Sequence, residues 1–98
     1  MIEKAQTAPS ADPQWFVYIL CCADGTLYTG ATTDVQRRLR EHNSGKRGAR
    51  YTRSRRPVSL LAFFRRENRS DALREENRIK GLSREQKLAL CASSEHRQ

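Results

Sequence analysis

Residues 15–30, WFVYILCCADGTLYTG, decide the fold of this chain. Apolar, aromatic and β-branched residues fill Trp15 to Cys22 and again Leu27 to Thr32, a composition that is typical of strands. The turn-forming residues Asp24 and Gly25 lie between the two runs. The pattern therefore predicts a β-hairpin.

The length of the hairpin loop determines on which face of the sheet two tyrosines lie. A three-residue loop that ends in a left-handed Gly25 places Tyr18 opposite Gly30. Tyr18 and Tyr28 then share one face, and Gly30 leaves room for a ligand backbone to approach. A two-residue loop separates the tyrosines, because side chains alternate with a period of two. The alternative to a site is that both tyrosines are ordinary half-buried strand residues.

Capping and turn residues predict the elements that follow the hairpin. They are a helix capped by Asp34 and running to about His42, a third strand from Val58 to Phe64, a helix capped by Ser70 and ended by Gly81, and a last helix begun by the capping box Ser83–Gln86. In the last helix, Leu88 and Cys91 are expected to pack inward. The expected fold is α+β, with a small three-stranded antiparallel sheet flanked by three helices.

The 98 residues are enough for one domain with a single small core. We expect a disordered leader at 1–13, a folded domain at 14–92 and a frayed tail at 93–98. The leader has no apolar run of the kind found in signal peptides or membrane spans. The three cysteines lack the spacing of a zinc site, and reduced thiols predict a cytoplasmic protein, with nucleoid association possible.

Positive charge is concentrated in one part of the sequence. The formal net charge is +8, and nine of the nineteen Lys and Arg residues fall between Arg37 and Arg56, where Glu41 is the only acid. Such a segment favours a polyanionic partner, and nucleic acid fits because phosphate contacts release counterions. The alternative is a solvated basic surface that serves solubility.

The segment from Gly45 to Pro57 has no apolar periodicity and is expected to be a basic loop. An aromatic side chain among arginines can stack on a base while the guanidinium groups contact phosphates. Together with Gly30, the candidate nucleic-acid-binding residues are Lys46, Arg47, Arg50, Tyr51, Thr52, Arg53 and Arg55. The alternative is a mobile solvated loop.

Two predicted helices supply further candidate residues. In the first, Val35, Leu39 and His42 form the inward stripe, and Arg38 lies at its edge, against the tyrosine face. In the second, Glu76 lies on the inward face. A carboxylate there needs an arginine such as Arg38 or a divalent cation as its partner. The alternatives are structural: a snorkelling arginine, a packing histidine and a salt bridge.

The order FVY, nine residues, YTG, then Arg38, and ALREE on a later helix resembles the GIY-YIG nuclease superfamily, with Phe16 in place of the first glycine. The resemblance covers residues 15 to about 91. It is strongest to small stand-alone bacterial members, and the sequence is also similar to the amino-terminal nuclease domain of the UvrC excision protein.

The resemblance implies a nuclease that uses one divalent cation, Mg²⁺ or Mn²⁺. By position, Tyr18 and Tyr28 would orient or deprotonate the attacking water, and Arg38 would stabilise charge on the phosphorane. Glu76 would hold the metal ion. His42 would assist proton transfer or contact phosphate.

The sequence is therefore interpreted as a metal-dependent DNA endonuclease of low sequence specificity. It would act on branched, nicked or single-stranded DNA in repair or recombination, without a membrane or a small-molecule cofactor. The alternatives are a nucleic-acid-binding module that does not cut, and a basic RNA-associated protein.

Overall fold

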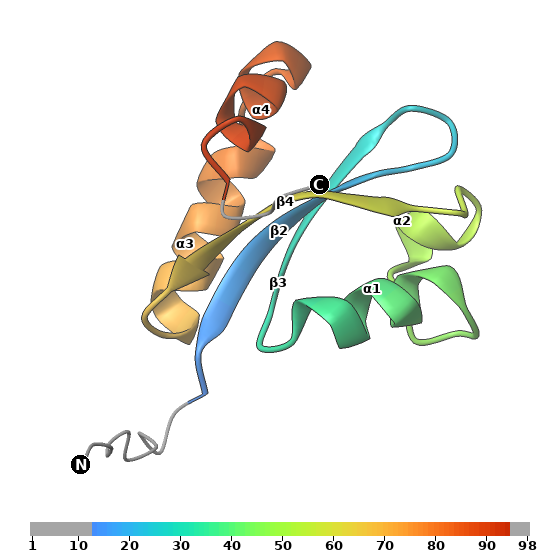
Figure 1. Cartoon of the computed structure of the whole chain (residues 1–98), viewed down its shortest axis with the longest axis horizontal. Coiled ribbons are helices and arrows are strands. Elements are labelled where there is room, and N and C mark those ends of the chain that lie inside the picture. Colours follow the sequence, from blue (N-terminus) through green and yellow to red (C-terminus); the bar gives the residue numbers. More distant parts are fainter. Residues whose placement is uncertain (1–12, 95–98) are drawn as a thin grey trace.

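The computed structural model describes residues 13–94, which form a three-stranded antiparallel sheet and four helices (Figure 1). The strands are β2 (Trp15–Cys21), β3 (Leu27–Thr32) and β4 (Ser59–Arg66), and the helices are α1 (Val35–Asn43), α2 (Arg50–Arg53), α3 (Arg69–Lys80) and α4 (Arg84–Cys91). The predicted α+β class and three-stranded sheet are confirmed. The prediction of three helices missed α2, a single turn inside the segment expected to be a loop.

The hairpin has the three-residue loop, which is the alternative that the functional interpretation requires. Gly25 has a φ of +84°, and the Cys22 N–H donates to the Thr26 carbonyl at 2.8 Å. Tyr18 pairs with Gly30 and Leu20 pairs with Tyr28, as expected. Both tyrosines therefore lie on one face of the sheet.

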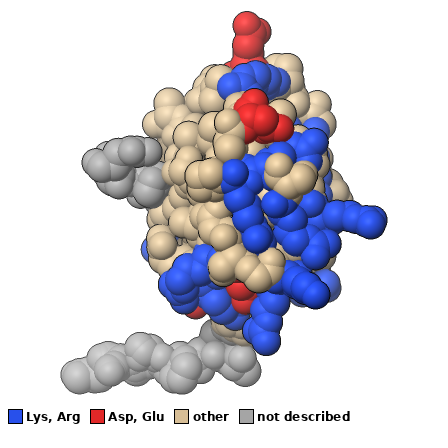
Figure 2. Space-filling view, turned by 90° about the vertical axis from the view of Figure 1, so that its right-hand side faces the viewer, with Lys and Arg blue, Asp and Glu red and all other residues tan. Residues whose placement is uncertain are grey.

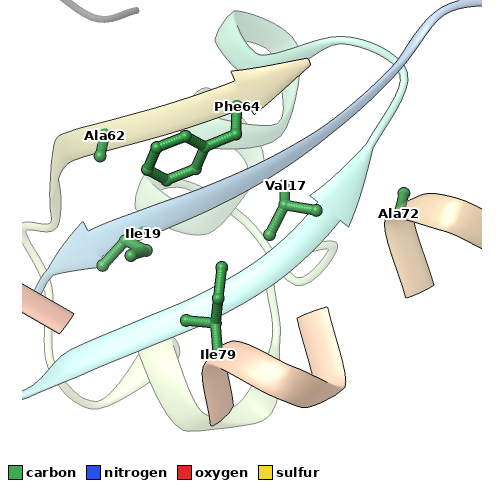
Figure 3. Close-up of a cluster of buried hydrophobic side chains, with 6 residues drawn as sticks. All are labelled: Val17, Ile19, Ala62, Phe64, Ala72 and Ile79. Carbon is green, nitrogen blue, oxygen red and sulfur yellow. The ribbon is translucent and has the colours of Figure 1, made fainter. Parts of the chain in front are cut away.

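The sheet is the central layer of the molecule, in the order β3-β2-β4. In Figure 1, α3 and α4 lie on one side of it, and α1 and α2 lie on the other. One apolar core fills the space between the sheet and α3 (Figure 3), and consists of Val17, Ile19, Ala62, Phe64, Ala72 and Ile79. A second core on the opposite face includes Tyr18, Leu20 and Leu60, with Val35 and Leu39 of α1 packed against it.

Two details of the helices differ from the prediction. The N-cap of α3 is Asn68 rather than Ser70, because the Asn68 side chain accepts from the Asp71 N–H while its own backbone is extended. In α4 the predicted capping box is present, but Leu88 is 42% exposed. Leu90 and Cys91 pack against the core instead, so Leu88 lies off the buried stripe.

The expected leader, apart from Pro13, and residues 95–98 lie outside the described residues. Within the expected tail, Ser94 is hydrogen-bonded to β4: its hydroxyl accepts from the Phe63 N–H at 2.9 Å and lies 3.1 Å from the Phe63 carbonyl. Among residues 13–94, none of the helices is long and apolar enough to cross a membrane.

Candidate active site

Tyr18 lies across the edge strand β3, above Gly30. A Cβ added at Gly30 would be 2.4 Å from the Tyr18 hydroxyl oxygen, so the tyrosine occupies the space that we had expected a ligand backbone to use. The Tyr18 side chain is only 2% exposed. Gly30 is therefore needed for the placement of Tyr18, which lies below the surface rather than in contact with solvent water.

His42 lies at the centre of the tyrosine cluster. Its Nε2 is 2.8 Å from the Tyr18 hydroxyl, and its ring centroid is 5.2 Å from that of Tyr28 in an edge-on contact. Its Nδ1 is 2.9 Å from Oγ1 of Thr52. Because His42 is fully buried, the expected contact with phosphate is not available to it, whereas a role in proton transfer is compatible with its position.

The charges of this cluster are set by burial. Burial raises the pKa of Tyr18 well above its usual value, the nearby Tyr28 and Glu76 raise it further, and Arg38 lowers it. Burial, together with Arg38 and Arg56, lowers the pKa of His42 to about 4. At neutral pH, Tyr18 is therefore a neutral phenol and His42 a neutral imidazole.

Tyr28 is the more accessible of the two tyrosines. Its ring stacks on that of Tyr51, with centroids 5.9 Å apart and planes 25° from parallel. The Arg55 guanidinium lies 3.8 Å from the centre of the Tyr51 ring and pairs with Asp24 at 3.0 Å. Tyr51 is 39% exposed. Arg55 is thus engaged within the protein, so it differs from the free phosphate ligand that we expected.

Arg38 reaches from α1 to the tyrosine face, as the helical spacing predicted. Its guanidinium pairs with Glu41 at 3.0 Å and donates to the Arg47 carbonyl at 2.8 Å. Arg38 lies close enough to Tyr18 to lower the pKa of that phenol. Partial burial lowers the pKa of Arg38 itself, but its hydrogen bonds with Glu41 and Tyr18 keep that pKa above its usual value. The side chain remains 26% exposed, so a substrate oxygen can reach it.

Glu76 extends from α3 toward the same cluster. Its partner is Lys80, at 2.9 Å, and not Arg38, which pairs with Glu41. The adjacent Glu75 pairs instead with Arg66 of β4 and with Arg78. Only Glu76 of these two carboxylates is among the groups that act on the Tyr18 pKa.

A metal ion at Glu76 would have to share its coordination with a substrate, because Glu76 offers a single carboxylate and pairs with Lys80 in this structure. Among residues 13–94, no group of three His, Cys, Asp or Glu side chains could enclose a metal ion. A single carboxylate nevertheless suits Mg²⁺ or Mn²⁺, because such ions complete their coordination with substrate phosphate and water. The same donor set is too small for a structural zinc site.

Exposed cations gather on the α1 and α2 side of the molecule (Figure 2). Five of them make no salt bridge within residues 13–94, namely Arg40, Lys46, Arg47, Arg50 and Arg53. Thr52, which we expected on this surface, is fully buried beneath it. The basic face therefore consists of the five unpaired cations with the exposed edge of Tyr51.

Sequence reasoning placed one residue of this site, Thr52, on the wrong side of its segment and missed another, Lys80. The inward position of Thr52 could not be seen because the segment lacked apolar periodicity, so that its single helical turn was not predicted. Lys80 follows Glu76 by four residues, a spacing that favours ion pairs on a helix, and this signal was present in the sequence.

The sheet carries two tyrosines on one face, with an arginine from one helix and a glutamate from another near them, in a small α+β domain. Residues 14–89 match the GIY-YIG catalytic domain family, and the chain belongs to that family. The predicted resemblance is thereby confirmed.

Relatives of similar size share the whole domain. The chain is 56% identical over 88 residues to the UPF0213 protein DP2720 of Desulfotalea psychrophila, covering 89% of this chain and 80% of that protein. It is 53% identical over 83 residues to the UPF0213 protein H16_B0156 of Cupriavidus necator, covering 85% and 89%.

Two solution NMR structures are similar to this fold. The UPF0213 protein BH0048 from Bacillus halodurans is 46% identical with a TM-score of 0.52, over 82% of this chain and 84% of that chain. The protein EF2693 from E. faecalis is 40% identical with a TM-score of 0.59, over 89% and 95%. The fold assignment agrees with these structures.

Proposed function

We propose that this protein is a metal-dependent endonuclease that hydrolyses phosphodiester bonds in DNA with low sequence specificity. One observation carries the proposal: the rings of Tyr18 and Tyr28 lie 6.4 Å apart on one face of the sheet, and Arg38 and Glu76, from two different helices, are both near enough to influence the pKa of Tyr18. Convergence of a phenol, a guanidinium and a carboxylate beside a basic face supports phosphoryl-transfer chemistry.

The exposure of each side chain suggests its role. Tyr28, which is only half-buried, orients the attacking water through its hydroxyl. The water oxygen bonds to phosphorus as the bond to the leaving oxygen breaks. The water proton is released through Tyr28 to solvent, and the leaving oxygen takes up a proton from solvent water to become a hydroxyl group. Arg38 donates hydrogen bonds to the phosphate oxygens on which charge develops. Tyr18 and His42 are positioning residues, because both are buried.

Glu76 is the residue that would hold the metal ion. A divalent cation on this carboxylate would supply charge stabilisation at the phosphate and favour deprotonation of water. To receive the ion, the carboxylate has to exchange its contact with Lys80. The released ammonium then lies where it can contact a substrate phosphate.

The basic face supports nucleic acid as the substrate. If each of the five unpaired cations contacts one phosphate, the slope of log K against log salt on duplex DNA is about −4.5. Because Arg55 covers a face of the Tyr51 ring, the exposed edge of that ring is the aromatic contact left for a base, which favours single-stranded, nicked or branched sites. Residues 13–94 form one small domain, without a second domain that could read a DNA sequence, and this supports low sequence selectivity.

The proposal is tested by cleavage of labelled single-stranded, duplex and branched DNA with Mg²⁺, Mn²⁺ or EDTA. We expect Glu76→Gln and Arg38→Ala to lose about 100-fold or more in metal-dependent cleavage while DNA affinity changes little. Glu75→Gln is the matched control for Glu76→Gln, because it removes the same charge from the adjacent position on α3. Arg74→Ala, also on α3, is the control that removes a guanidinium paired with Asp71, outside the tyrosine cluster. Equal cleavage by Glu76→Gln and Glu75→Gln would contradict the assignment.

The basic face also favours a second candidate, a nucleic-acid-binding module that does not cut. That function needs only the unpaired cations and Tyr51. Wild-type protein that binds DNA without cleaving it under any metal condition would establish this second candidate. Competition with RNA of matched length and salt distinguishes a DNA substrate from an RNA partner.

A further inference from the structure

The short helix α2 presents one fully buried hydroxyl to the site, that of Thr52. Its Oγ1 lies 2.9 Å from Nδ1 of His42 and 2.8 Å from the carbonyl oxygen of Ala49. On the other side of the imidazole ring, Nε2 lies 2.8 Å from the Tyr18 hydroxyl. A buried line of polar atoms therefore runs from Ala49 through Thr52 and His42 to Tyr18.

One arrangement of protons fits this line of atoms best. The Arg38 cation attracts the lone pairs of the Tyr18 hydroxyl oxygen. The hydroxyl hydrogen therefore points away from Arg38 and is donated to His42 Nε2. In a neutral imidazole the other nitrogen, Nδ1, then carries the proton. It donates that proton to Thr52 Oγ1, and the Thr52 hydroxyl donates to the Ala49 carbonyl.

The opposite tautomer is less favourable. If Nδ1 carried no proton, the Thr52 hydroxyl would donate to it and would face the Ala49 carbonyl with lone pairs only, at 2.8 Å. The preferred tautomer gives up one hydrogen bond, the long one of 3.3 Å that the Ala49 N–H could donate to an unprotonated Nδ1. The longer contact is the less costly one to leave unsatisfied, since electrostatic repulsion falls with distance.

We propose that Thr52 is a positioning residue that holds the His42 ring in its Nδ1-protonated tautomer and thereby orients both tyrosines. The inference rests on the proposed function, because it assigns Thr52 to the hydrolytic site. His42 transmits the effect through its hydrogen bond to Tyr18 and its edge contact with the Tyr28 ring. An imidazole without Thr52 can change tautomer and tilt, so both contacts lose their fixed geometry.

The test variant is Thr52→Val, which keeps the shape of the side chain and removes the hydroxyl. Thr52→Ser keeps the hydroxyl and serves as the rescue variant. Thr29→Val is the matched control: Thr29 is also buried, and its hydroxyl has no hydrogen-bond partner within residues 13–94. It points to the opposite face of the sheet from Tyr28, its neighbour in β3.

Two measurements are made on each variant. The ¹⁵N chemical shifts of the His42 ring, recorded without nucleic acid near neutral pH, report the tautomer. We expect the Nδ1-protonated form in wild type, Thr29→Val and Thr52→Ser, and a mixture in Thr52→Val. Cleavage by Thr52→Val should be about 10- to 100-fold slower, with DNA affinity within about twofold of wild type and most of the rate restored by Ser.

The inference is overturned if Thr52→Val keeps the wild-type ring shifts, or if Thr29→Val lowers the rate as much. A fall in DNA affinity that accounts for the lost rate would also overturn it. If wild type does not cleave DNA, the proposed function fails. The ring shifts still decide whether Thr52 sets the tautomer of His42, so the two failures are distinguishable.

Discussion

Replacement of Gly30 by alanine would test whether Tyr18 requires the space above β3. The new Cβ would lie 2.4 Å from the Tyr18 hydroxyl oxygen and 2.6 Å from its Cζ. Non-bonded atoms need roughly 3.5 Å, so the end of the ring has to move by about 1 Å. The same movement lengthens the 2.8 Å contact with His42 Nε2 to about 3.8 Å, which is no longer a hydrogen bond.

The structure sets the size of the expected effect. Overpacking in a core costs about 1–3 kcal/mol, and the loss of one buried hydrogen bond costs about 1 kcal/mol. The free energy of unfolding of Gly30→Ala should therefore fall by about 2–4 kcal/mol. A displacement of about 1 Å at an active site lowers the rate by about 100-fold, and we expect a loss of this order in cleavage.

Urea unfolding and single-turnover cleavage measure the two effects. Gly81→Ala is the control, because a Cβ at Gly81 would lie 3.5 Å from the Arg78 carbonyl, an ordinary contact, and its φ of −83° suits alanine. It should change stability by no more than about 1 kcal/mol. The reasoning is refuted if Gly30→Ala unfolds like Gly81→Ala and cuts like wild type.

Two further predictions concern charge. Because the pKa of buried His42 is lowered from 6.5 to about 4, the unfolded chain binds a proton that the folded chain does not, and stability should fall as the pH drops from about 6.5 toward 4. The full loss of unfolding free energy is about 3 kcal/mol. Urea unfolding above about pH 5, where carboxylates contribute little, should show the free energy of unfolding falling as the pH is lowered in wild type, and His42→Gln should remove this dependence. Lys80→Met removes the ammonium that competes with a metal ion for Glu76. Titration with Mn²⁺ should therefore show binding about two- to fivefold tighter than in wild type. Unchanged or weaker binding would argue against Glu76 as the metal ligand.

The sequence predicted the hairpin because strand and turn preferences are local rules. Asp24 and Gly25 mark the turn but are compatible with a loop of two or three residues. Only the requirement that Tyr18 and Tyr28 share a face, through the period of two, favoured the three-residue loop that the structure has. The inward placement of Arg38 followed in the same way from helical periodicity.

The depth of each side chain could not be predicted, because it depends on contacts between distant segments. Thr52 and Arg55 were read as surface residues of a basic loop. In the fold, Thr52 turns inward to His42, and Arg55 is held by Asp24 from the hairpin turn. The roles of Tyr28, Arg38 and Glu76 stay predictions for the cleavage assays.

The three-residue hairpin loop also limits which insertions and deletions the chain can tolerate. Removal of Ala23 alone would shift the pairing of β2 with β3 by one position and turn Tyr28 toward α3, away from Tyr18 and His42. A change of two residues would preserve the alternation and keep the tyrosines together. During divergence of such chains, the length of this loop is therefore free to vary in even steps, whereas an odd step separates the tyrosines unless a β-bulge compensates.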